Sequence, residues 1–228
     1  MKYQPANSGL VKIPGKPEDY TDDQLASLQT LSDVMATGYH AALNAEVKPG
    51  YTVAVIGDDA VGLAGVTGAK LLDAEKIILL SHHDDRAQLG REFGATDIVS
   101  SRDEESIKDV LALTKENAGA DAVLECVGAE SAIEQAGQIA RPGAVIGRVG
   151  VPHAEPKSNQ LFWKNVGLRG IASATKPDKE VLLQVVLDGK INPGKVFTKS
   201  FDLDHIQDAY EAMSNRDAIK SLIIVNDK

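Results

Sequence analysis

The chain has 228 residues, 43% of them hydrophobic, which is enough for one large domain or one domain with an appendage. A formal net charge of −9 argues against a nucleic-acid partner held through its phosphates, and the single cysteine, Cys126, excludes an internal disulfide and a cysteine-rich zinc lobe. No apolar run reaches membrane-spanning length and no signal-peptide core is recognisable, so we expect no membrane partner and a cytoplasmic location.

The first 34 residues have the pattern of a connecting piece from another domain. Residues 10–13 predict one short strand, isolated by the prolines and glycine that follow, and a lone strand cannot pair its edges. Thr21 opens a capping box and a first helix, and Ser32 or Asp33 caps a second helix. We therefore expect residues 1–34 to be the remnant of a neighbouring domain.

The stretch over residues 52–72 organises the rest of the chain. Thr52–Ile56 is a short β-branched apolar run, typical of a strand buried on both faces, and Gly57 ends it. A helix with small residues on one side follows. A strand that turns on glycine into a helix is the phosphate-binding corner of a dinucleotide fold, because free N–H groups and the helix dipole attract an anion. Gly57 and Gly62 occupy the outer glycine positions, but Asp59 replaces the middle one.

Asp59 adds bulk and negative charge where the backbone must approach a pyrophosphate. Two unit charges 4 Å apart repel by about 1 kcal/mol in water and about 4 kcal/mol at an effective dielectric of 20. We therefore expect impaired cofactor binding. The alternative is that the loop shifts and Asp59 points to solvent at little cost.

Strands and helices alternate through the next hundred residues. The predicted strands cover residues 76–80, 97–100, 122–127, 144–150 and 166–172, and the predicted helices cover residues 84–93, 104–115 and 131–140. This alternation predicts the α/β class, as a Rossmann-type, doubly wound, parallel six-stranded sheet with helices on both faces. Residues 35–174 form this domain.

Residues 175–228 form a third region. It holds predicted helices over residues 177–189 and 204–214 and a final strand over residues 220–225. That strand has no βα partner in the pattern, and we expect it to leave the main sheet.

The end of the second strand selects the cofactor in such a fold, because an acidic residue there binds ribose hydroxyls and favours NAD. Here Ser81 is small, His82 and His83 are potential cations, and Arg86 could approach from the helix start. These residues leave room for a 2′-phosphate and favour NADP over NAD, although two aspartates that follow weaken the argument. The alternative is that the two histidines are only solvated.

Other reactive side chains give weaker signals. Asp33 near a helix start is typical of a cap. Cys126 follows Glu125 within the core strand predicted over residues 122–127, which favours an inert, buried thiol. His40, His153 and His205 have no Cys or His at ligand spacing, so we expect them at the surface or in packing contacts.

Several motifs, in this order and at this spacing, resemble the zinc-dependent alcohol dehydrogenases of the medium-chain dehydrogenase/reductase family. They are SDVMATGYH at residues 32–40, VKPG at 47–50, VGL at 61–63, FGATD at 93–97, ECVG at 125–128, GRVGVP at 147–152 and DHIQDAY at 204–210. The resemblance covers nearly the whole chain from Leu10 onward. It implies hydride transfer between NAD(P) and an alcohol or carbonyl, with zinc acting as a Lewis acid.

The resemblance also implies that most of the family's GroES-like catalytic β-barrel is missing from this chain. Two of the three protein ligands of the catalytic zinc would lie in that part. Asp33 matches the third ligand position, and one carboxylate cannot hold a catalytic zinc. The strands predicted over residues 10–13 and 220–225 would be what the barrel leaves behind.

By the same resemblance, Thr37 lies beside the nicotinamide, Val61 packs on its face, residues 149–151 pair with its carboxamide, and Lys220 lies near the pyrophosphate. The expected cofactor-binding residues are Thr37, Gly57, Asp59, Ala60, Val61, Gly62, Ser81, His82, His83, Arg86, Val127, Val149, Gly150, Val151 and Lys220.

Two functions therefore stand side by side. The first is an NAD(P)-dependent, alcohol dehydrogenase-like oxidoreductase, truncated and inactive alone. The second is a non-catalytic dinucleotide-domain remnant that associates with itself. The resemblance implies a dimer contact through the last sheet strand, near residues 166–172. Without the barrel, exposed apolar surface and sheet edges favour association into a homodimer or larger assembly.

Overall fold

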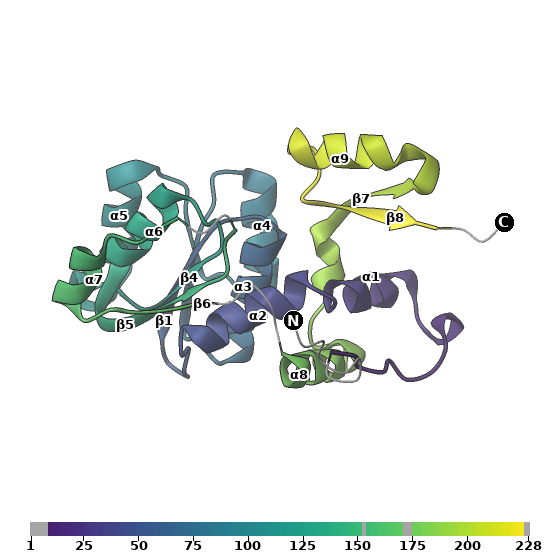
Figure 1. The fold of residues 1–228 in the computed structure, drawn as a ribbon, viewed down its shortest axis with the longest axis horizontal. Coiled ribbons are helices and arrows are strands. Elements are labelled where there is room, and N and C mark those ends of the chain that lie inside the picture. Colours follow the sequence, from purple (N-terminus) through teal and green to yellow (C-terminus); the bar gives the residue numbers. More distant parts are fainter. Residues whose placement is uncertain (1–8, 152–153, 171–174, 226–228) are drawn as a thin grey trace, which may run out of the picture.

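The computed structural model describes residues 9–151, 154–170 and 175–225. Its main body is a six-stranded parallel sheet with the order β3-β2-β1-β4-β5-β6, between layers of helices (Figure 1). The strands are β1 (Thr52–Ile56), β2 (Lys76–Leu80), β3 (Asp97–Val99), β4 (Ala120–Glu125), β5 (Ala140–Arg148) and β6 (Gly167–Gly170). This order is that of doubly wound dinucleotide folds, so the predicted fold class is confirmed.

The central strand is buried on both faces, as its apolar run predicts. Val53 and Val55 point into one hydrophobic core, and Ala54 and Ile56 point into the other. The first core is closed by α2 (Val34–Asn44), α3 (Ala60–Leu71), α4 (Asp84–Phe93) and α8 (Lys176–Leu187), and the second by α5 (Asp103–Ala112) and α6 (Glu130–Ile139). The sheet therefore holds its carboxyl edge rigidly.

Most predicted elements agree closely with the structure. The predictions for β1, β2 and α4 match at both ends, and the other predicted elements of the main sheet differ by up to four residues, as at the start of β5. The last two residues of the strand predicted over 166–172 lie outside the described residues. The sequence pattern missed α7 (Ser158–Lys164), because this helix has no buried residue and so no apolar stripe.

The strand predicted over residues 10–13 is wrong. The structure has no strand there, and Leu10 and Ile13 are 66% and 45% exposed. No described strand lies beside this segment to pair with it. The following helix, α1 (Asp22–Thr30), begins as predicted, since Thr21 Oγ1 accepts from the backbone N–H of Gln24 and Gln24 Oε1 accepts from that of Thr21.

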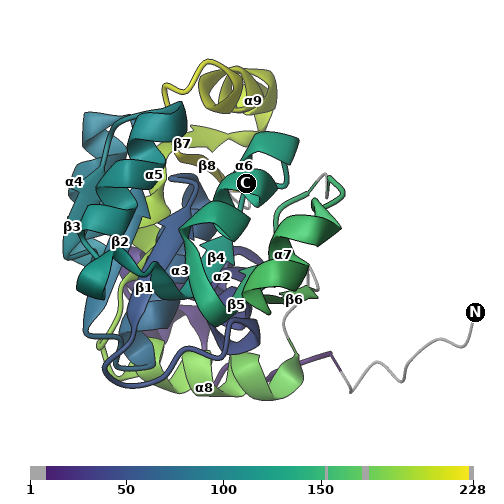
Figure 2. The same ribbon diagram turned by 90° about the vertical axis from the view of Figure 1, so that its left-hand side faces the viewer.

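The last strand, β8 (Lys220–Ile224), leaves the main sheet as predicted. It pairs in parallel with β7 (Phe197–Asp202) through α9 (Ile206–Ser214), so the expectation that it lacks a βα partner is wrong. The pattern missed β7 because four of its six residues are exposed. Figure 2 shows α9 and α8 at opposite ends of the molecule. Short 3-10 turns complete the chain: η2 (Pro17–Asp19), η3 (Lys115–Asn117), η4 (Pro193–Val196) and η5 (Leu203–His205).

The first segment and the C-terminal region are joined to each other. Ser27 Oγ on α1 donates to Asn192 Oδ1 at 2.7 Å and accepts from Gly194 N at 3.1 Å. The domain boundaries predicted after residues 34 and 174 stay predictions. Over the described ranges, every helix is too short or too polar to cross a membrane.

Candidate functional site

The sheet brings most of the predicted site residues to one edge. In the parallel register, Ile56 pairs with Leu80 and with Glu125, and Glu125 pairs with Arg148. The residues that follow these strand ends therefore lie side by side, at the place where open parallel sheets bind ligands.

The glycine corner has the geometry that its motif predicts. Gly57 has a φ of +109°, which favours glycine. A Cβ added to Gly62 would lie 1.9 Å from the Gly57 carbonyl oxygen, so only glycine permits this approach of α3 to β1. Ala60 and Val61 follow at the helix start, and the Asp59 side chain makes no capping hydrogen bond there. The first-turn N–H groups are therefore not capped by Asp59 and suit an anion.

Arg86 is bound to the corner itself. Its buried guanidinium donates to Asp59 Oδ1 and, at 3.3 Å, to Asp58 Oδ1. Ser81 Oγ donates to Asp58 Oδ2 at 2.9 Å. This arrangement differs from the expected one, in which Arg86 is a free cation for a 2′-phosphate, because the two loop carboxylates already engage it.

The Asp59 side chain is 79% exposed and that of Asp58 is 15% exposed. Two carboxylates against one guanidinium leave the corner with a net negative charge. Solvent and Arg86 both reduce the repulsion that Asp59 exerts on a pyrophosphate, compared with an unpaired, buried carboxylate.

The two histidines after β2 have different partners. His82 Nδ1 lies 2.9 Å from the carbonyl oxygen of Ser100. His83 Nε2 lies 3.0 Å from Arg216 Nη1 and accepts its hydrogen bond. Arg216 was not among the predicted site residues, and nothing in the sequence pattern connects two residues 133 positions apart.

At the other end of the edge, Thr37 is buried and donates to Asp33 Oδ1 at 3.0 Å. Val127 and Val151 are 42% and 70% exposed, whereas Val149 is buried. The N–H groups of the first two residues of the 149–151 loop both donate to the Glu125 carbonyl oxygen, at 2.9 and 3.2 Å. A carboxamide would therefore have to meet other atoms of this loop.

The residues present do not fit a catalytic zinc ion. Among residues 9–151, 154–170 and 175–225, no three His, Cys, Asp or Glu side chains are grouped so that they could hold a metal. Asp33 has only the Thr37 hydroxyl as its side-chain partner there, and a zinc site needs about three protein ligands.

The remaining reactive groups are engaged elsewhere. Burial raises the pKa of the Cys126 thiol above its ordinary value, and the charge of Glu125 raises it further, which disfavours the reactive thiolate. The side chain is partly exposed and not buried as expected. His40 Nδ1 lies 3.1 Å from Asp178 Oδ2 in a buried contact between α2 and α8. His205 is exposed beside Asp202, and His153 lies outside the described residues.

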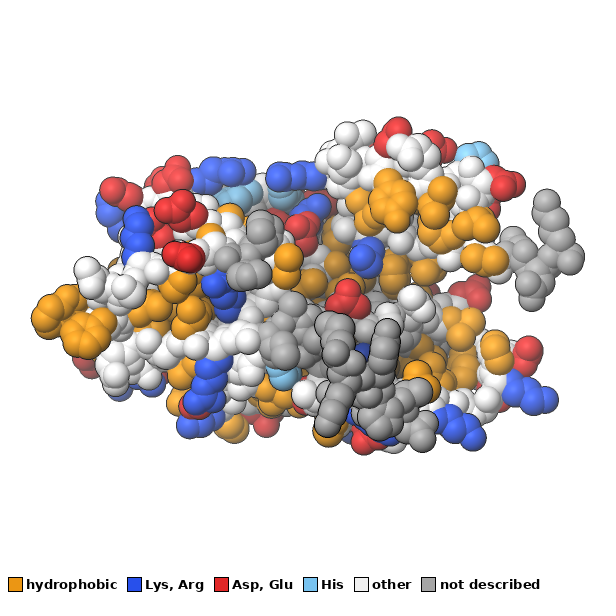
Figure 3. Space-filling model, viewed as in Figure 1, with side chains coloured by type: hydrophobic (Ala, Val, Ile, Leu, Met, Phe, Trp, Pro, Cys, Tyr) orange, Lys and Arg blue, Asp and Glu red, His pale blue; other side chains and the backbone are white. Residues whose placement is uncertain are grey.

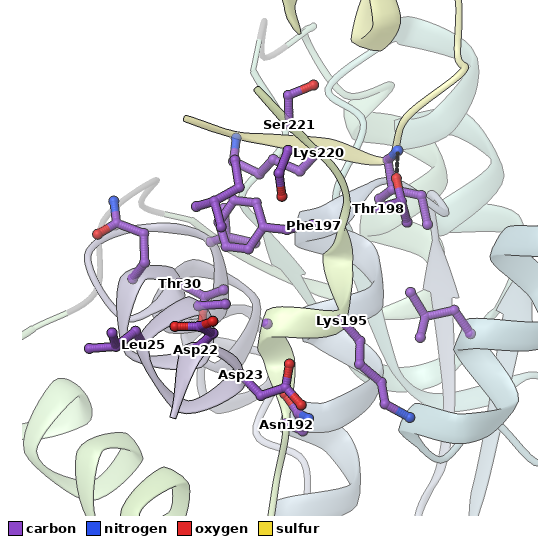
Figure 4. A pocket seen from close by; sticks show the side chains of 18 of the residues that line it. Asp22, Asp23, Leu25, Thr30, Asn192, Lys195, Phe197, Thr198, Lys220 and Ser221 are labelled. Carbon is purple, nitrogen blue, oxygen red and sulfur yellow. Dashed lines mark hydrogen bonds between the residues drawn. The ribbon is translucent and has the colours of Figure 1, made fainter. Parts of the chain in front are cut away.

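A cavity of about 1340 Å³ opens between α1, α4 and the β7–β8 sheet. Figure 4 shows Lys220 and Phe197 reaching into it from the two strands, with Asp22 and Asp23 below on α1. Asp33 also lines it, but the glycine corner does not. Lys220, expected near the pyrophosphate, therefore faces this cavity.

The strand order and the glycine corner are those of the α/β folds that bind dinucleotides. A family model described as zinc-binding dehydrogenase matches residues 60–188. An alcohol dehydrogenase from Cupriavidus necator is 30% identical over 227 residues, which cover 96% of this chain and 60% of that protein. An NADP-dependent isopropanol dehydrogenase from Clostridium beijerinckii is 28% identical, over 90% of this chain and 61% of that protein.

Solved structures agree with these matches. The apo form of zinc dependent alcohol dehydrogenase 2 from Streptococcus pneumonia has a TM-score of 0.80 and 29% identity, covering 93% of this chain and 61% of its own. The chain belongs to the zinc-binding dehydrogenase family, which confirms the resemblance seen in its motifs. It spans about 60% of the length of these relatives.

Proposed function

We propose that this chain is the dinucleotide-binding part of an alcohol dehydrogenase-like oxidoreductase, in which hydride passes between a nicotinamide and an alcohol or carbonyl. The observation that carries the proposal is the corner from Gly57 to Gly62, followed by α3, at the carboxyl edge of a sheet with dinucleotide-fold order. The bound nicotinamide would supply the hydride. The residues of this chain would hold and orient it.

We propose NADP as the cofactor, with NAD as the alternative. Ser81 leaves no acid at the end of β2, and His83 and Arg216 lie together just beyond it. The relative from Clostridium beijerinckii is named as NADP-dependent. The pairing of Arg86 with Asp58 and Asp59 favours NAD, because it leaves one cation fewer to bind the 2′-phosphate of NADP. The same aspartates support weakened binding of either cofactor.

Titration of NADPH and NADH into the protein tests this proposal, by calorimetry or by the fluorescence of the reduced nicotinamide. We expect saturable binding above micromolar dissociation constants, with NADPH bound more tightly. Tighter binding of NADH would assign the cofactor to NAD. Failure of both to bind at millimolar concentration would overturn the proposed function.

We further propose that this chain turns over no alcohol by itself, because Asp33 lacks two companion ligands among the described residues. Assays with zinc, primary and secondary alcohols and either cofactor should stay at background. Activity that persists through purification and disappears in Asp33→Ala would contradict this.

The second candidate is a non-catalytic module that associates with itself in the cytoplasm, without nucleic-acid or membrane partners. Phe162 and Trp163 on α7 are 74% and 83% exposed. Figure 3 shows a group of hydrophobic side chains at the left end of the molecule, the end at which α7 lies in Figure 1. Phe162 and Trp163 lie close in sequence to the edge strand β6. Such surface favours a homodimer or larger assembly. A monomer mass by light scattering at micromolar concentration would contradict it.

A further inference from the structure

Glu125, at the end of β4, lies between the two loops expected at the nicotinamide end of the site. Its side chain is fully buried. Its carbonyl oxygen accepts from the N–H groups of Val149 and Gly150, at 2.9 and 3.2 Å. Its Oε1 accepts from those of Val127 and Gly128, at 2.8 and 2.6 Å. One residue therefore binds four backbone N–H groups, two from each loop.

Arg148, the last residue of β5, completes this arrangement. Its Nε lies 3.5 Å from Glu125 Oε2, with the two side chains 12% and 0% exposed. Its Nη2 donates to the Ala154 carbonyl oxygen at 2.5 Å, and Ala154 N donates to Gly128 O at 3.0 Å. The contact is an ion pair without a hydrogen bond, since neither Arg148 Nε nor Glu125 Oε2 has a hydrogen-bond partner among the described residues. A buried charge is costly unless it is paired, so Arg148 supplies the counter-charge that Glu125 needs between the two loops.

The loops are also in direct backbone contact. A Cβ added to Gly150 would lie 2.1 Å from Gly128 N, so no side chain fits between them. A shift of one loop must therefore move the other. Val127 and Val151, whose side chains are exposed, belong to these two contacting loops.

We propose that Glu125 and Arg148 are positioning residues, which fix the backbone platform for the nicotinamide end of the dinucleotide and leave its adenosine end unaffected. This inference rests on the proposed function. The four N–H groups held by Glu125 are occupied, so the pair acts through the shape of the loops. The adenosine end would depend on the separate network of Asp58, Ser81 and Arg86.

The test compares two ligands that share the ADP-ribose part. NADH carries the nicotinamide ring and ADP-ribose does not, so the ratio of their dissociation constants isolates the ring. Arg148→Met removes the charge and Arg148→Lys keeps it. We expect Arg148→Met to weaken NADH about tenfold, to leave ADP-ribose within about twofold, and to lose the fluorescence change of the bound nicotinamide. Arg148→Lys should keep the ratio of the ADP-ribose and NADH dissociation constants close to that of the wild-type protein.

The matched control is Arg141→Met at the other end of β5, where Arg141 pairs with Asp121 at 2.7 Å. It should change neither affinity. Circular dichroism confirms folding, and Glu125→Gln carries the same comparison if Arg148→Met does not fold.

Equal weakening of both ligands by Arg148→Met, or no change in either, would overturn the positioning role. Equal affinity of the wild-type protein for NADH and ADP-ribose would also overturn it, while dinucleotide binding would stand. If the wild-type protein binds neither ligand, the proposed function fails and this inference fails with it.

Discussion

Two charged networks lie at the same edge of the sheet and differ in their exposure to water. At the glycine corner, the paired Arg86 and Asp58 side chains are 5% and 15% exposed, and only the third member, Asp59, is largely exposed, at 79%. At the ends of β4 and β5, Glu125 and Arg148 are 0% and 12% exposed. Water screens the Asp59 carboxylate, so that side chain mainly sets the charge that a ligand meets. Water does not reach the paired atoms of the second network, so the Glu125–Arg148 pair is unscreened and fixes the conformation of the loops.

The largest expected effect is on stability, in the buried network. Arg148→Met leaves the Glu125 carboxylate buried without its counter-charge, and we expect a loss of about 3 kcal/mol in the free energy of unfolding. Arg141→Met on the same strand breaks a half-exposed pair and should cost less than about 1 kcal/mol. Urea unfolding measures both. Equal losses in the free energy of unfolding would show that the different burial of the two pairs does not affect how much each contributes to stability.

The next effect is on affinity, at the exposed carboxylate of the glycine corner. Asp59→Gly restores the middle glycine and leaves Asp58 to pair with Arg86, so we expect dinucleotide binding to tighten about tenfold, or about 1.4 kcal/mol. Asp59→Asn is the matched control, because it removes the charge and keeps the bulk. Calorimetry with NADPH and NADH measures both variants. Unchanged affinity in both would mean that the loop holds Asp59 away from the ligand.

The contrast between these networks also explains how far the sequence could predict the structure. The sheet strands were found because a strand buried on both faces needs a continuous apolar run, as in Thr52–Ile56. Both β7 and α7 were missed because neither contains a fully buried residue. Residues 10–13 have the composition of a strand, but no strand of the described residues pairs with them.

In the candidate site, the glycine corner was predictable because its residues are consecutive in the chain. The direction of the Arg86 side chain was not, since it depends on carboxylates 27 and 28 residues away. The pairing of His83 with Arg216 needs the C-terminal region to fold back over α4. Glu125 was visible in the ECVG motif, but only the structure shows that it binds both loops.

The smallest effect on stability is expected at an exposed pair, His205 and Asp202, because water screens both charges. His205 Nδ1 lies 2.6 Å from Asp202 Oδ1 at the start of η5. Hydrogen bonding to Asp202 raises the pKa of His205, and hydrogen bonding to His205 lowers the pKa of Asp202. The histidine contribution to stability is therefore complete below the unfolded pKa of about 6.5 and is lost as the pH rises through the raised value. The aspartate contribution is present above about pH 4 and is lost as the pH falls.

The pair should stabilise the protein most between about pH 4 and 6.5, and His205→Gln should lower the melting temperature slightly at about pH 5.5 and not at about pH 9. A difference in melting temperature that stays constant across this range would show that His205 acts through packing, and not through its charge.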